Sequence, residues 1–227
     1  MSIILENLDL VVRAFATTLL LFAVSAVLSL VGGTVLAAMR VGPVAVLRAA
    51  GATYVGLVRN TPLLLVLLFF RFAAPRIGIT FDVIDVSFGG VNLDNLFTAA
   101  VVALSVYTSA FVCEALRSGI NAVPLGQAEA ARAIGLPFGG VMSQVILPQA
   151  VRASVPPLAS VQIALLKNTT VAGAFGVFEA FARMRFFTND DPTQRYGIFV
   201  TFALIFVVLV LALSFVANRL ERRWRVA

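Results

Sequence analysis

The 227-residue chain contains no histidine, one cysteine (Cys113) and one lysine (Lys167). A single cysteine excludes an intramolecular disulfide, and the lack of histidine excludes Cys/His zinc frameworks and Ser–His or Cys–His nucleophile pairs. A nucleotide-binding P-loop needs a lysine after a glycine-rich turn, but Lys167 lies in Leu165-Leu166-Lys167-Asn168. The sequence therefore predicts no catalytic residue, no metal site and no ATP-binding site in this chain, which is not expected to be an enzyme.

Charge is also scarce. Only 12% of the residues are charged and 60% are apolar, whereas soluble domains are about 25% charged. The mean hydropathy of +1.00 indicates that lipid forms part of the solvent, so we expect an all-α integral membrane protein. The net charge of +6 does not indicate a nucleic-acid partner, because basic residues lie singly between apolar runs and cluster only at Arg219–Arg225.

Long runs with little charge predict five membrane-spanning helices in a single transmembrane domain, residues 1–227, without an internal repeat or a separate soluble domain. Crossing a bilayer takes about 20 residues. The expected spans are residues 14–39, 49–72, 95–116, 153–178 and 196–218. Pro156-Pro157 and Lys167-Asn168-Thr169-Thr170 interrupt the fourth run, which predicts a broken helix whose freed backbone groups line a wet path.

The basic residues near the span ends predict the orientation. With the N-terminus outside, ten arginines fall on the cytoplasmic side and six on the outer side. The positive-inside rule then places the C-terminus in the cytoplasm. The cytoplasmic set is Arg40, Arg48, Arg59, Arg117, Arg132, Arg152, Arg219, Arg222, Arg223 and Arg225.

A cytoplasmic loop, residues 118–151, is expected to form a compact elbow of two short helices. Pro124 suits a first helical turn, and Gly135 followed by Pro137 is a helix stop. A second short helix over residues 139–145 is expected to end at Leu147-Pro148.

The elbow carries a recognisable spacing: Glu129-Ala130-Ala131, three residues, Gly135, nine residues, then Val145-Ile146-Leu147-Pro148. This resembles the E-A-A-x3-G-x9-I-x-L-P signature of permeases in ATP-binding-cassette (ABC) importers, with Val145 in place of isoleucine. The resemblance implies a type I importer permease fold whose elbow docks into a groove of a cytoplasmic ATPase. An ordinary amphipathic loop helix is the alternative. The residues expected to couple to the ATPase are Gly126, Glu129, Ala130, Ala131, Gly135 and Leu136.

Further segments resemble the polar amino-acid branch of these permeases, especially glutamate and glutamine permease subunits of actinobacteria. They are Arg59–Pro62, Tyr107–Phe111, Arg117–Ile120, Pro148–Ala150 and Lys167–Thr170, with Asn60 where glycine is commoner and Asn168 where aspartate is commoner. The resemblance implies two ATPase subunits that bind ATP and Mg²⁺, a second identical or homologous permease subunit, and an extracytoplasmic solute-binding protein at a bacterial cell membrane. The outer segment, residues 81–94, is expected to contact that binding protein.

Lys167 lies at bilayer depth, where an ionisable group costs about 2.5–3.5 kcal/mol on insertion scales and normally faces a cavity or a partner. Its ammonium group is a candidate for attracting a substrate carboxylate, but it also suits snorkelling toward the helix end. A structural role for Arg59, packing for Tyr107 and a Glu114–Arg117 ion pair are the plainer interpretations of those residues. The residues expected to line the substrate path are Lys167, Asn168, Thr169, Arg59, Thr61 and Tyr107.

Together these features predict the transmembrane subunit of an ATP-driven importer of a polar amino acid, glutamate or glutamine. The rival is a secondary amino-acid transporter driven by an ion gradient. Such a transporter is expected to show an internal repeat and an intramembrane acid, and this sequence shows neither.

Overall fold

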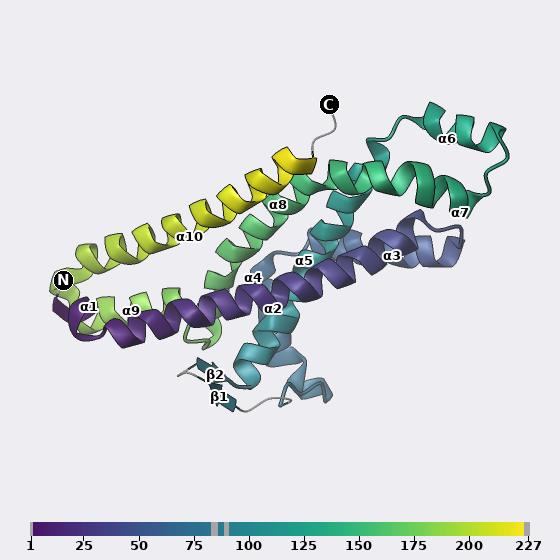
Figure 1. Ribbon diagram of the computed structural model, residues 1–227. Helices are drawn as coiled ribbons and strands as arrows, with labels where there is room; N and C mark the ends of the chain where they lie inside the picture. The colour runs from purple at the N-terminus through teal and green to yellow at the C-terminus, as the bar shows by residue number, and fades with distance from the viewer. Residues whose placement is uncertain (1, 83–85, 89–90, 225–227) are drawn as a thin grey trace.

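The computed structural model describes residues 2–82, 86–88 and 91–224. Within these residues, three helices are long and apolar enough to cross a bilayer by themselves: α2 (Leu8–Val41), α5 (Asn95–Asn121) and α10 (Arg195–Trp224). A short helix, α1 (Ser2–Glu6), precedes α2. Figure 1 shows α2 and α10 along the length of the molecule, with α8 (Leu147–Ala172) beside α10. Two bent helix pairs bring the possible spans to five, the expected number.

The second expected span, residues 49–72, is broken rather than continuous. Helix α3 (Ala45–Arg59) is followed by α4 (Leu63–Leu68) and a π-helical turn (Phe69–Ala73), and the two parts meet at 102°. Pro62 causes the break, because it lacks an N–H and disfavours helical geometry at the preceding residue. The side chains of Asn60 and Thr61 donate hydrogen bonds to the Gly56 and Leu57 carbonyls, which stabilises the end of α3.

The fourth span breaks at a different place from the one expected. The prediction that Pro156-Pro157 and Lys167–Thr170 interrupt the helix is wrong, because α8 runs through both segments. The Thr169 and Thr170 hydroxyls donate to carbonyls three residues earlier, so these polar groups are satisfied within the helix. The break follows α8, at a 3₁₀ turn (Gly173–Phe175) and Gly176, whose φ is +100°. Helix α9 (Ala180–Asp190) then continues at 50°.

The second part of the elbow also differs from the prediction. Helix α6 (Leu125–Ala133) forms as expected, but Leu147-Pro148 does not end the next helix. Helix α7 (Phe138–Gly140) passes through a π-helical turn (Val141–Ile146) directly into α8. Pro148 lies in the first turn of α8, where a missing N–H costs least.

Small residues allow the central helices to approach closely. Helix α5 is the most enclosed of the three long helices, with 67% of its most apolar stretch buried against 11% in α10. A Cβ at Gly33 of α2 would overlap Val112 of α5, and one at Gly119 of α5 would overlap Ser154 of α8. Close contact through small residues is the usual way in which membrane helices associate, because lipid supplies no hydrophobic force between them.

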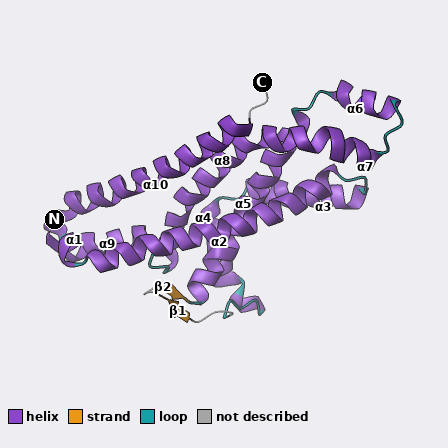
Figure 2. Cartoon of the chain, in the orientation of Figure 1, coloured by secondary structure: helices purple, strands orange, loops and turns teal. Residues whose placement is uncertain are grey.

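A short hairpin lies at the other end of α5 from the elbow (Figure 2). Its antiparallel strands, β1 (Val86–Phe88) and β2 (Val91–Leu93), are the only β-structure in the described ranges. Asp94 caps α5 by accepting a hydrogen bond from the Phe97 N–H. In the outer segment expected to contact a binding protein, residues 83–85 and 89–90 lie outside the described residues. Two further 3₁₀ turns, Pro75–Ile77 and Pro192–Gln194, complete the elements.

Candidate functional site

The elbow turns at Gly135 through a defined C-cap. The Gly135 N–H donates to the Arg132 carbonyl at 2.9 Å, and the Leu136 N–H donates to the Ala131 carbonyl at 3.1 Å. This pair of bonds is a Schellman motif, which requires a left-handed residue after the helix. Gly135 supplies it with a φ of +90°. The turn therefore depends on the glycine that the sequence signature places there.

Helix α6 presents an exposed surface at one end of the molecule (Figure 1). The Leu125 and Ile134 residues are 80% and 81% exposed. Across the elbow, the Gln149 amide of α8 donates to the Gln127 side-chain oxygen at 2.5 Å. Of the expected coupling residues, Gly126, Glu129, Ala130 and Gly135 are exposed, Leu136 is half-buried and Ala131 is buried.

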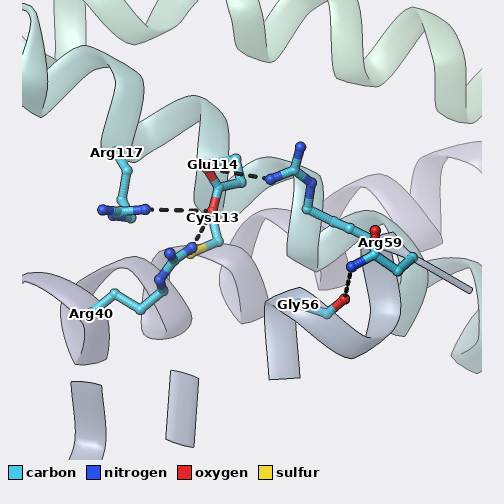
Figure 3. Close-up of polar contacts among 7 residues, drawn as sticks. Arg40, Gly56, Arg59, Cys113, Glu114 and Arg117 are labelled. Atoms are coloured by element: carbon cyan, nitrogen blue, oxygen red, sulfur yellow. Dashed lines mark hydrogen bonds and ion pairs between the residues drawn. The ribbon is translucent and has the colours of Figure 1, made fainter. Parts of the chain in front are cut away.

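An ion cluster lies at the elbow end of α5, where Glu114 meets arginines from three helices (Figure 3). Arg40 of α2 forms a close ion pair with Glu114 and also contacts the Cys113 sulfur at 4.0 Å. Arg59, at the end of α3, lies 3.5 Å from Glu114 Oε2, and Arg117 of α5 lies 3.5 Å from Oε1. The expected Glu114–Arg117 pair is therefore present, but as one part of a larger cluster that ties α2 and α3 to α5.

Sequence reasoning missed the role of Arg40. It was counted only as a cytoplasmic basic residue, because nothing in a linear pattern pairs it with a carboxylate 74 positions away. Its side chain is the least exposed of the arginines in the cluster, at 15%. The signal in the sequence is a basic residue at the end of an apolar helix, which predicts a carboxylate partner at the same membrane depth.

The expected path residues fall into two groups. Arg59 lies over the Phe111 ring at 5.9 Å, and Phe111 packs against Tyr107 with ring centroids 5.0 Å apart. Phe111 thus links Arg59 to Tyr107. Thr61 lies nearby at the break after α3, with its hydroxyl bonded to the Leu57 carbonyl at 2.9 Å.

The other path residues lie on α8. Lys167 is exposed, Asn168 is half-buried and Thr169 is buried. The Thr169 hydroxyl donates to the Leu166 carbonyl at 2.7 Å, so it faces the helix backbone. Lys167 precedes by six positions the 3₁₀ turn that begins at Gly173, and thus lies near the break of the fourth span.

Residues 29–226 match the family described as "Binding-protein-dependent transport system inner membrane component". The chain belongs to this family. Membership in this family, together with the apolar helices and bent pairs, indicates a multi-pass inner membrane protein. The predicted class of protein, a permease subunit of an ABC importer, is confirmed.

Similar proteins agree with the assignment. The chain is 44% identical to "Glutamate transport system permease protein GluC" of Corynebacterium efficiens, over 94% of this chain and 93% of that protein. It is 34% identical to "Probable glutamine ABC transporter permease protein GlnM" of Bacillus subtilis, over 98% of this chain and 96% of that protein. A solved structure described as an amino acid ABC transporter with histidines superposes with a TM-score of 0.84 at 27% identity, covering 97% and 96% of the two chains. The expected all-α type I importer permease fold is confirmed.

Proposed function

We propose that this inner membrane component is the transmembrane subunit of an ATP-driven importer of a polar amino acid. The observation that carries the proposal is the exposed elbow helix, ended by a glycine Schellman motif, in a chain of this transport family. The partners are two ATPase subunits, which bind ATP and Mg²⁺, a second permease subunit, and an extracytoplasmic solute-binding protein. The N-terminus lies outside and the C-terminus in the cytoplasm.

Glutamate is the favoured substrate and glutamine the second candidate. The identity of 44% to a glutamate permease exceeds the 34% to a glutamine permease.

In this proposal the elbow transmits motion. Closure of the ATPases on ATP displaces α6, which presents Glu129 together with the exposed Leu125 and Ile134 as a docking surface. The Gln127–Gln149 hydrogen bond connects α6 to α8, the helix that carries Lys167. Displacement of the elbow thereby moves a path helix, and the spans change from inward-facing to outward-facing.

The path is assigned to Lys167, Asn168 and Thr169 on α8, with Arg59, Thr61 and Tyr107 as secondary contributors. A carboxylate that crosses a low-dielectric passage needs a compensating charge or several donors. The exposed ammonium of Lys167 supplies that charge. Arg59 is less available, because it already contacts Glu114 and Phe111.

Uptake in proteoliposomes containing this chain, the ATPases and the binding protein tests the proposal. We expect ATP-dependent accumulation of labelled glutamate that dissipating ion gradients does not abolish. Uptake that follows an imposed ion gradient without ATP would favour a secondary transporter and overturn the proposal. Competition by glutamine identifies the preferred substrate.

Gly135→Asp tests the role of the elbow, and Gly78→Asp is its matched control. Both glycines have a left-handed φ, +90° and +86°, and neither has a neighbour within 4 Å that an added Cβ would meet. The two substitutions therefore impose similar backbone strain. We expect the Gly135 variant to insert normally but lose uptake, while the Gly78 variant retains it. Uptake at the parental rate by the Gly135 variant would exclude the elbow from coupling.

Lys167→Met tests the path, because it retains side-chain length and removes the charge. We expect uptake to fall sharply while the loaded binding protein still stimulates ATP hydrolysis. Uptake at the parental rate would indicate that Lys167 only snorkels or braces α8, and would remove it from the path without affecting the transporter assignment.

A further inference from the structure

A polar pocket lies at the end of the molecule opposite the elbow. It has a volume of about 370 Å³, within the range of small-molecule sites. Its charged lining residues are Arg13 of α2, Asp94 at the start of α5, and Arg183 of α9. Arg13 and Arg40 are separated by 27 residues of α2, so the pocket lies about 40 Å from the Glu114 cluster. In the proposed orientation it opens on the outer side.

Arg183 is held by aromatic rings and retains unused donor capacity. Its guanidinium lies over the Phe178 ring at 5.5 Å and the Phe186 ring at 5.6 Å. Stacking uses the faces of the guanidinium and leaves its N–H edge for a planar acceptor. Its Nε is buried and has no hydrogen-bond partner among the described residues. A buried donor without a partner is costly, so the guanidinium has donor capacity left for an acceptor that enters the pocket.

The other two charges are also available to a ligand. Arg13 lies 3.8 Å from Asp9, but both side chains are more than half exposed, so this pair is weak and readily exchanged. Asp94 uses Oδ1 to accept the Phe97 N–H at 2.9 Å, which leaves Oδ2. The pocket lining therefore offers two guanidiniums and one carboxylate oxygen.

We propose that this pocket binds an acidic amino acid at the outer mouth of the transporter. Arg183 and Arg13 bind the two carboxylates, and Asp94 accepts the ammonium group. This arrangement matches the charges of glutamate, two negative and one positive, whereas glutamine would leave one guanidinium without a counter-charge. Bidentate guanidinium–carboxylate bonds are among the stronger polar contacts in proteins, which supports selection of the acid over the amide.

The inference deepens the proposed function and rests on it for the importance of glutamate. The pocket includes Gly176 and Phe178, which lie in the break after α8, nine and eleven positions beyond Lys167. A substrate released by a binding protein would occupy the pocket first and the Lys167 region second. The pocket thus acts before the path that Lys167 is proposed to line.

Binding to the full-length chain in nanodiscs, without binding protein, tests the site. We measure saturable binding of labelled L-glutamate in the parental protein and in Lys167→Met. Arg183→Gln is compared with Arg185→Gln, which removes an exposed arginine from the same helix but not from the pocket. We expect Arg183→Gln to weaken binding about tenfold or more, and Arg185→Gln to leave it unchanged. Binding should survive Lys167→Met.

Asp94→Asn with two ligands supplies an internal check on folding. Asparagine is also a good helix N-cap, so the start of α5 should remain intact. The variant should bind L-glutamate more weakly and bind glutarate, which has two carboxylates and no ammonium, with parental affinity. Loss of glutamate binding in Lys167→Met would assign the site to the inner path and overturn the proposal. Equal binding by Arg183→Gln and Arg185→Gln, or no saturable binding at all, would also overturn it, without bearing on ATP-dependent uptake.

Discussion

The two charged regions at opposite ends of α2 use the same residue types differently. At the elbow end, Glu114 is contacted by Arg40, Arg59 and Arg117, and each of these described contacts lies within 4 Å. At the opposite end, the buried Nε of Arg183 has no described partner, and the described partner of Arg13 is the exposed Asp9 carboxylate at 3.8 Å. The first region sets three arginines around one carboxylate, whereas the second has two arginines and two carboxylates, and among the described residues only the Arg13–Asp9 pair joins them.

The difference follows from which elements meet. Helices α2, α3 and α5 pack directly at the elbow end, so arginines from all three helices reach the Glu114 carboxylate. Their ion pairs connect α2 and α3 to α5. At the other end α2 and α9 also pack directly, with the Thr18 hydroxyl accepting a hydrogen bond from the Ala180 N–H. There, however, Arg13, Asp94 and Arg183 border a pocket that residues 176–178 help to line. Charges that meet each other hold a fold together, whereas charges that face a cavity are available to a ligand.

Glu114→Gln is expected to have the largest effect on stability. It removes the charge that compensates three arginines near the membrane, and the partial exposure of the cluster reduces the cost to about 1–3 kcal/mol. Thermal unfolding can be followed by the loss of helical circular dichroism, which does not depend on Cys113, a residue that Arg40 contacts. Glu6→Gln, which changes an exposed carboxylate on α1, is the control and should not alter the transition. Equal transitions in the two variants would show that the cluster does not stabilise the fold.

Replacing single arginines should have smaller, graded effects. Arg40 is 15% exposed and Arg59 is 45% exposed, so solvent screens the Arg59–Glu114 pair more strongly. We expect Arg40→Gln to lower stability by about 1–2 kcal/mol and Arg59→Gln by less than about 1 kcal/mol. The same unfolding assay measures both. A greater loss of stability in Arg59→Gln than in Arg40→Gln would mean that fixing the end of α3 stabilises the fold more than the buried Arg40–Glu114 pair does.

Asp9→Asn should have the smallest effect. The Asp9–Arg13 pair is 51% and 62% exposed at its two side chains and 3.8 Å long, so its contribution is about 0.2–0.5 kcal/mol or less. Stability should stay within error of the parental value. Glutamate binding should be unchanged or slightly tighter, because Arg13 loses a competitor. Weaker binding in Asp9→Asn would place Asp9 in the site and contradict the charge balance proposed for the pocket.

Much of the fold could be predicted from local patterns. Long uncharged runs correctly indicated α2, α5 and α10, because a helix that crosses the bilayer needs about 20 consecutive apolar residues. Gly135 indicated the end of α6, because a Schellman turn needs a left-handed residue and glycine adopts that conformation without strain. The Glu114–Arg117 pair was also predictable from a local pattern, because residues three apart on a helix are neighbours.

The predicted helix breaks at Pro148 and at Pro156-Pro157 were wrong, because a proline does not end a helix in every position. Pro62 ends α3, but Pro148 and Pro156-Pro157 are accommodated within one helical run. In α8, close packing against Gly119 of α5 accompanies a continuous helix, and the break occurs at Gly176 instead. A proline removes one hydrogen bond, and whether the helix survives depends on what packs around it.

The sequence by itself determined the membrane class, the long spans and the turn at Gly135, because each depends on residues adjacent in the chain or on one face of a helix. Only the tertiary structure decided that Arg40 and Arg59 join Glu114, and that Arg13, Asp94 and Arg183 border one pocket. Arg13 and Arg183 are 170 positions apart. Electrostatic partners are chosen by distance in space, and spacing along the chain carries no record of that distance once it exceeds a helical turn.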